Sequence, residues 1–260
     1  MRGGRRGTPA AAHDTPGTDD WGGKVVLVAG ATRGLGQDVA TRLAAHGATV
    51  MMLSRSLEEA VGMGETSPGG VFGRLSTDLS KPAELVQAIG HILDLGGVDV
   101  LINVAAPLDP VQPYTETEAT TMERVFQLNV VVPADLSVSL LPRMVERGWG
   151  RIVNVSGGLA GDQVSAVSDA YVASRDALET YTRNLAARLS GTGVTANVYR
   201  SGAVDAGLQV IERRRRTESG SLHSRVVSYA HNGVPPGKEA VPLLRLLRSD
   251  QTGKIWAADG

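Results

Sequence analysis

The sequence predicts an α/β protein built on one doubly wound parallel sheet of about seven strands flanked by helices. From Lys24 onward, short apolar runs alternate with longer helical patterns, which is typical of βαβ units. Runs such as Val25-Val26-Leu27-Val28 are almost continuously apolar, as expected of strands that are buried on both faces. A length of 260 residues suits a single sheet covered by helices on both sides. No repeat or second domain is visible.

The elements are expected in a regular order. Each apolar run rich in β-formers is predicted to be a strand, which places strands at residues 24–29, 49–53, 71–75, 99–103, 151–155, 194–199 and 254–257. The longer stretches with helical periodicity are predicted to be helices, at residues 35–46, 82–93, 117–147, 168–189 and 238–247. Ligands are then expected outside the carboxyl ends of the strands, where the strand order reverses.

Residues 1–22 are expected to form a disordered tail in front of one domain at 23–260. The segment is rich in Gly, Pro, Thr and Asp and has no apolar run that would serve as a signal-peptide core or a membrane span. The Arg5-Arg6 pair hints at a twin-arginine signal, but acidic Asp19-Asp20 follow instead of an apolar stretch. We therefore expect a solvated extension and a cytoplasmic protein.

Composition favours small-molecule chemistry over macromolecular partners. The net charge of −1 gives no overall field for nucleic acid or an anionic membrane. There is no cysteine, so disulfides and thiolate metal sites are excluded. The five histidines are scattered without ligand spacing, so no metal site is predicted.

A glycine cluster, Gly30-Ala31-Thr32-Arg33-Gly34-Leu35-Gly36, stands between the first strand and the first helix. In this context a glycine-rich turn presents backbone N–H groups and a helix N-terminus to a pyrophosphate. The sequence therefore predicts a Rossmann-type sheet that binds a dinucleotide.

The end of the second strand indicates which dinucleotide is bound. Ser54-Arg55 stand there, with no acid to accept hydrogen bonds from a free ribose 2′-hydroxyl. A cation suits a 2′-phosphate, and Arg33 in the glycine turn is placed to provide a second one. NADP(H) is therefore favoured over NAD(H). The alternative is that both arginines are solvated surface charges.

Tyr171 and Arg175 are four residues apart in a predicted helix, so they share one face of it. A phenol with a cation beside it is a plausible proton donor. The alternative is that Arg175 pairs with a surface carboxylate and Tyr171 only packs.

Together these motifs resemble the short-chain dehydrogenase/reductase family over residues 23–260, although the chain departs from the family pattern. Asn103-Val104-Ala105-Ala106 stands in place of Asn-Asn-Ala-Gly, and Arg175 replaces the lysine of Tyr-x-x-x-Lys. Thirteen residues before Tyr171, where the resemblance implies a catalytic serine, stands Gly158. Halohydrin dehalogenases share Tyr-x-x-x-Arg, but they carry an aromatic residue where this chain has Gly34, and they keep the serine.

The resemblance implies roles for a set of site residues. Tyr171 would donate the proton, Arg175 would supply charge, and Asn129 would hold a water. The cofactor would contact Gly30, Arg33, Gly34, Leu35, Gly36, Ser54, Arg55, Asp78, Leu79, Asn103, Ala105, Tyr171, Arg175, Gly202 and Val204. Asp78 has a structural alternative as a cap of the helix that begins near Pro82, although the spacing is poor.

Ser156 is a candidate for the missing hydroxyl. It lies two residues before Gly158, which places it about 6–7 Å away along a strand. A bulge at Gly157-Gly158 would bring it closer, since glycine permits such kinks. The alternative is a hydroxyl that caps the strand end.

We expect an NADP(H)-dependent oxidoreductase that interconverts a carbonyl and an alcohol, with Tyr171 as proton donor. The alternative is a cofactor-binding but catalytically weak homologue with a regulatory, structural or non-redox role, which Gly158 and Arg175 favour. The run Arg213–Arg216 is either a solvated helix face or a docking site for a carrier-bound anionic substrate. Apolar faces on helices 117–147 and 168–189 predict a homodimer or homotetramer.

Overall fold

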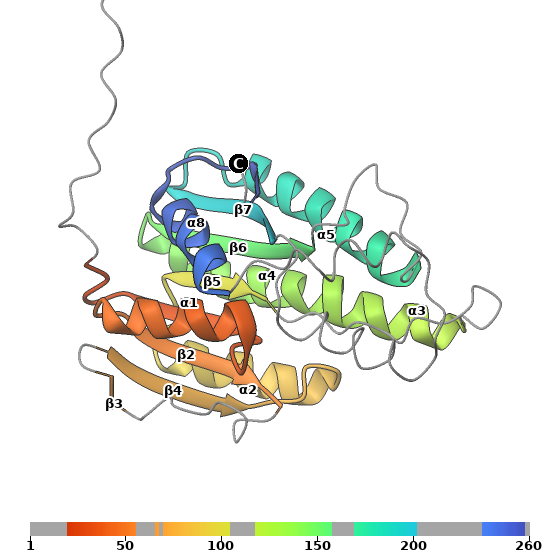
Figure 1. Cartoon of the computed structure of the whole chain (residues 1–260), viewed down its shortest axis with the longest axis horizontal. Helices are drawn as coiled ribbons and strands as arrows, with labels where there is room; N and C mark the ends of the chain where they lie inside the picture. Colours follow the sequence, from red (N-terminus) through yellow and green to blue (C-terminus); the bar gives the residue numbers. More distant parts are fainter. Residues whose placement is uncertain are drawn as a thin grey trace, which may run out of the picture.

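The structure, a computed structural model, describes residues 20–55, 66–67, 70–104, 118–157, 169–201 and 236–257. Its core is a sheet in the order β3-β4-β2-β1-β5-β6-β7-β8, flanked by helices (Figure 1). Seven strands run parallel, and the two-residue β3 pairs antiparallel with β4 at one edge. The predicted doubly wound sheet of about seven strands is confirmed. A strand as short as β3 leaves no periodic signal.

All seven predicted strands are present, within a few residues at each end. They are β1 Val25–Ala29, β2 Thr49–Ser54, β4 Gly70–Ser76, β5 Val100–Asn103, β6 Gly150–Gly157, β7 Val194–Ser201 and β8 Ile255–Ala257, with β3 at Thr66–Ser67. The predicted helices correspond to α1 Gly34–Ala45, α2 Pro82–Asp94, the run α3 Ala119–Phe126, η2 Gln127–Val131 and α4 Val132–Glu146, then α5 Asp169–Arg188 and α8 Pro236–Arg248.

Strand β1 explains why the sheet needs cover on both sides. Val26 and Val28 pack into one core cluster with α1 and α8, while Leu27 and Ala29 pack into the other with α2 and α4. All four side chains are buried, since successive side chains point to opposite faces. The near-continuous apolar runs of the sequence follow directly from this two-sided burial.

The strand order reverses beside β1, which lies between β2 and β5. From β1 the chain first builds outward through β2 and β4, and then crosses to β5 on the other side. A switch point of this kind is where ligands are expected to bind, outside the carboxyl ends of β1 and β5.

The long helix at 117–147 was expected to be regular, but it contains the five-residue π-helical segment η2. Such segments insert an extra residue into an α-helix and are frequent at functional sites. Ala119–Glu146 is long and apolar enough, by length and composition, to cross a membrane. Its inner residues Leu136, Leu140 and Met144 are buried in the core, so part of this apolar character belongs to sheet packing.

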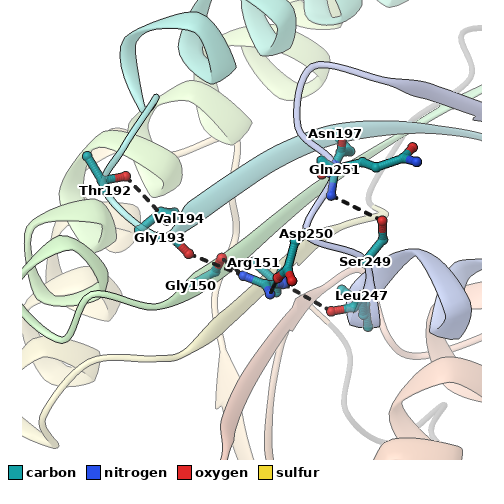
Figure 2. A network of polar contacts seen from close by, with 10 residues as sticks. All are labelled: Gly150, Arg151, Thr192, Gly193, Val194, Asn197, Leu247, Ser249, Asp250 and Gln251. Atoms are coloured by element: carbon teal, nitrogen blue, oxygen red, sulfur yellow. Dashed lines mark hydrogen bonds and ion pairs between the residues drawn. The ribbon is translucent and has the colours of Figure 1, made fainter.

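The amino ends of the strands are tied together by Arg151 on β6 (Figure 2). Its buried guanidinium donates to the carbonyls of Gly150, Gly193 and Leu247, and it pairs with Asp250 at 2.6 Å. One side chain thus connects β6, the turn before β7, and the end of α8. This edge of the sheet lies opposite to the carboxyl ends of the strands.

The folded part of the chain reaches back to Trp21, which was expected to lie in the tail. Its indole is 6% exposed and packs in the core cluster that α1 contributes to. The backbone N–H of Trp21 donates to the carbonyl of His46. Residues 1–19 lie outside the described part of the chain.

Candidate functional site

Each of the three glycines in the turn is required by the backbone for a physical reason of its own. Gly30 and Gly34 have φ angles of +91° and +58°, which other residues rarely adopt. A β-carbon at Gly36 would collide with the carbonyl oxygen of Gly30, so α1 approaches the end of β1 only if this position has no side chain. The tight strand–turn–helix geometry thus requires all three glycines.

The N-terminus of α1 is suited to an anion. Its N-cap residue Arg33 makes no side-chain capping hydrogen bond, and no acidic residue stands in the first turn. The first N–H groups of the helix and its dipole therefore have no competing carboxylate from this turn. Leu35 is buried beneath it. The residues present fit the pyrophosphate of a dinucleotide.

Arg55 follows β2 and is exposed, while Ser54 is half-buried. Hydrogen bonds from Ser80 lower the pKa of Asp78, and the charge of Arg55 acts in the same direction. The structure therefore brings Arg55 and Asp78 together beyond the carboxyl ends of β2 and β4. A cation and an acid at this edge are consistent with a site for the adenosine half of a cofactor.

The alternative role of Asp78 as a helix cap is wrong. The N-cap of α2 is Lys81, three residues later, and it makes no side-chain cap. Asp78 Oδ1 instead accepts hydrogen bonds from the backbone and hydroxyl of Ser80, in a turn of its own. The adjacent Leu79 is buried in the core.

Asn103 ends β5, next to β1, and is 3% exposed. Its Nδ2 donates to Asn154 Oδ1 on β6, and Asn154 Nδ2 in turn donates to Thr182 Oγ1 on α5. Within the described part of the chain, the Oδ1 atom of Asn103 is buried without a hydrogen-bond partner. A buried chain of amides thus links the expected cofactor-binding strand to the helix that carries Tyr171.

Tyr171 lies near the start of α5 and is only 4% exposed. Its hydroxyl rests against Gly157, the last residue of β6: a β-carbon there would be 2.5 Å from Tyr171 Oη. The spacing of the resemblance pointed to Gly158, which lies outside the described residues. The position that faces the phenol is Gly157, fourteen residues before Tyr171.

Arg175 does not pair with a surface carboxylate, so that alternative is wrong for the described residues. It is 3% exposed, and its guanidinium carbon lies 5.0 Å from the centre of the Tyr171 ring. One terminal nitrogen donates to the carbonyl of Val155 at 3.0 Å, and Nε has no hydrogen-bond partner among the described residues. The cation is therefore held against the face of the phenol by strand β6.

Asn129 lies within η2 and is fully buried. Its Nδ2 donates to Ser174 Oγ at 3.0 Å, and that hydroxyl donates to the carbonyl of Tyr171 at 2.7 Å. Asn129 Oδ1 is buried and has no hydrogen-bond partner among the residues that the structure describes, and its role in holding a water stays a prediction. Ser174 was not predicted, because a serine inside a helical pattern carries no signal of its own.

Ser156 is placed less favourably than the sequence suggested. It is 1% exposed, and its Oγ makes only a 3.5 Å contact to the carbonyl of Gly157. Ser201, on the neighbouring strand, donates to the carbonyl of Ser156 at 3.3 Å. The remaining candidates Ala105, Gly202, Val204 and Arg213–Arg216 lie outside the described residues.

A partly buried ion pair beside the site was not predicted. Glu179 on α5 accepts two hydrogen bonds from Arg200 on β7, at 2.8 and 2.7 Å. Glu179 is 6% exposed, one helical turn beyond Arg175. Because the partners are 21 residues apart, no local spacing reveals the pair. It fixes α5 to the carboxyl end of β7, near Tyr171.

Comparison with known proteins gives a consistent set of relatives. The sequence model of the short chain dehydrogenase family matches residues 24–217. The ketoacyl reductase HetN of Nostoc sp. is 33% identical over 198 residues, which is 74% of this chain and 67% of that protein. The D-beta-hydroxybutyrate dehydrogenase of Cupriavidus necator is 29% identical over 252 residues, covering 92% of this chain and 97% of the relative.

Solved structures agree with the fold. A protein described as an NAD(P)-dependent gluconate 5-dehydrogenase from Beutenbergia cavernae, with NADP bound at low occupancy, superposes with a TM-score of 0.78 at 26% identity. The match covers 93% of this chain and 97% of that one. L-sorbose reductase from Gluconobacter frateurii, with NADPH and L-sorbose, gives a TM-score of 0.81 over 92% and 95% of the two chains, but at 19% identity it supports the fold alone.

Proposed function

The chain belongs to the short-chain dehydrogenase family, and we propose that it is an NADP(H)-dependent oxidoreductase that interconverts a carbonyl compound and an alcohol. One observation carries this proposal: the hydroxyl of Tyr171 lies at the carboxyl end of β6, with the Arg175 cation against its ring. The glycine turn, which follows β1, and the phenol of Tyr171 both lie at the carboxyl ends of the strands of one sheet. A proton donor and a dinucleotide site at one crevice are the requirements of this chemistry.

The proposed reaction divides the work between cofactor and protein. When bound, the nicotinamide supplies the hydride that reduces the carbonyl carbon. Tyr171 donates its hydroxyl proton to the carbonyl oxygen, which yields the alcohol, and it recovers the proton in the reverse direction. The guanidinium of Arg175 stabilises the negative charge left on the phenol. The hydrogen bonds from Asn129 to Ser174 and from Ser174 to the carbonyl of Tyr171 hold the start of α5, and so position the phenol for proton donation.

The proposed preference for NADP(H) rests on charge at the adenosine end. Arg33 is the N-cap of α1, Arg55 follows β2, and both residues are exposed, so each is available to a ribose bound at this end of the sheet. A 2′-phosphate would accept hydrogen bonds from both. No acid stands at the end of β2 to select a free 2′-hydroxyl. The presence of NADP in a relative at 26% identity supports this choice.

The test is to mix the purified full chain with NADPH and a panel of ketones, aldehydes and β-ketoacyl thioesters, and to follow the loss of NADPH absorbance. We expect turnover of at least one class, and Tyr171→Phe should lower it by about 10²-fold or more. Calorimetry on both proteins should give the same affinity for NADPH. Tight NADPH binding with no turnover of any compound would contradict the proposal and favour a cofactor-binding, non-catalytic homologue.

A further inference from the structure

We propose that Ser201 supplies the hydroxyl that holds the substrate oxygen, in place of a serine at the position of Gly157 on strand β6. This assignment rests on the proposed function and adds a catalytic residue to it. Gly157 faces the Tyr171 hydroxyl but has no side chain to donate a hydrogen bond. A donor aimed at the reacting oxygen is worth about 10²–10³ in rate, so an active enzyme with glycine at this position needs a donor from elsewhere.

The register of the sheet places Ser201 beside this gap. Ser201 on β7 is the Cα partner of Gly157 on β6 in a parallel ladder. Partners in such a ladder lie about 4.8 Å apart and direct their side chains to the same face. The direction that the Gly157 side chain would take leads to Tyr171 Oη. Ser201 therefore projects from the same face, one strand away from the phenol.

The same alternation separates Ser156 from the phenol. Ser156 precedes Gly157 by one residue on β6, and it is at Gly157 that a β-carbon would meet the phenol. One residue along a strand reverses the face. Ser156 is also almost fully buried, whereas Ser201 is partly exposed. Of the two hydroxyls, only that of Ser201 combines the right face with access.

The present contact of Ser201 is easily exchanged. Its Oγ donates to the carbonyl of Ser156 at 3.3 Å, longer than the 2.7–2.8 Å that is usual for O–H···O hydrogen bonds. A serine hydroxyl rotates freely to a better acceptor. When a carbonyl oxygen lies between Tyr171 and Ser201, the phenol gives it a proton and Ser201 gives it a hydrogen bond, so Ser201 keeps its own proton throughout.

The test compares serine variants with the best substrate found in the NADPH assay. Ser201→Ala should lower kcat/KM by about 10²–10³-fold, and Ser201→Thr, which keeps a hydroxyl, should remain within about tenfold of the natural protein. NADPH affinity by calorimetry and the unfolding midpoint should stay unchanged in both. Ser249→Ala, at the opposite edge of the sheet, is the matched control and should have full activity.

The outcomes separate this assignment from the proposed function. If the natural protein reduces a carbonyl compound and Ser201→Ala does so at a rate within about threefold of it, the role of Ser201 is overturned and the proposed function stands. A larger loss in Ser156→Ala than in Ser201→Ala would overturn it in favour of Ser156. If the natural protein oxidises NADPH in the presence of none of the carbonyl compounds, both the proposed function and the role of Ser201 are overturned.

Discussion

At the scale of single residues, the sequence was most informative where a backbone conformation demands one residue type. Gly30, Gly34 and Gly36 could be assigned because only glycine fits a positive φ or a close approach of helix and strand. Gly157 could not be assigned from spacing, because the length of the loop before α5 differs by one residue from the pattern of the resemblance. The contact that identifies it joins two elements, and no count along the chain contains it.

Arg55 is predicted to select the cofactor. Arg55→Ala should weaken NADPH binding by about 1–3 kcal/mol, the contribution of a charged hydrogen bond, and leave NADH affinity nearly unchanged. Calorimetry with both nucleotides measures the difference directly. Equal losses for NADPH and NADH would show that Arg55 supports the fold of the site and does not read the 2′-phosphate.

Gly157 is predicted to control the position of Tyr171. In Gly157→Ala the new methyl group would lie 2.5 Å from Tyr171 Oη, so the phenol must shift. Turnover should fall by at least about tenfold, since small displacements of a catalytic group are costly. Gly90→Ala is the control, because nothing lies within 4 Å of that β-carbon position on α2. Full activity in Gly157→Ala would mean that the observed closeness of strand and phenol is not needed.

At the scale of elements, existence and order were predictable but internal irregularities were not. Periodicity identified the helix at 117–147, yet it gave no sign of the π-helical turn at Gln127–Val131. That turn arises from tertiary packing, because α3, η2 and α4 must fit both the sheet and α5 while Asn129 reaches Ser174. The hydrophobic pattern records which face is buried, but not a one-residue offset within it.

Arg151 is predicted to be a principal support of the edge opposite the site. Arg151→Met would leave the carbonyls of Gly193 and Leu247 without this donor, the second of them in a buried hydrogen bond, and should lower the free energy of unfolding by about 2–4 kcal/mol. Asp250→Ala removes only the partner that is 94% exposed and should cost less than about 1 kcal/mol. Urea unfolding of the two variants provides the comparison. Similar losses for both would assign the effect to the ion pair.

At the scale of the whole molecule, the parallel sheet and the point where its strand order reverses could be predicted from the sequence, because the apolar runs are typical of buried strands. What did not follow were the long-range polar links, such as Glu179–Arg200 and Asn103–Asn154–Thr182. These join residues on different elements, and polar residues within strand and helix patterns look alike whether they pair or face water. A cytoplasmic location stays a prediction.

Assembly is predicted from an uncovered apolar stripe on the long helix. Val131, Val138 and Val145 are 45%, 53% and 39% exposed and recur at seven-residue intervals, so they line one side of the helix. Covering this stripe with the same helix of a second copy would give a dimer, or a tetramer if a further face is used. Light scattering should show such an oligomer, and Val138→Glu should shift it toward monomer. A monomeric natural protein at micromolar concentration would contradict this.

The position of Arg151 in the chain also concerns how the protein is made. Its partners Leu247 and Asp250 are 96 and 99 residues further along. At about 5–20 residues per second, synthesis leaves this guanidinium without them for roughly 5–20 s after it is added to the chain. Strand β7 is added during that interval, before the residues that complete the contacts of Arg151 at the amino edge. The segment at Leu247 and Asp250 is therefore made after the strands whose amino ends it joins through Arg151.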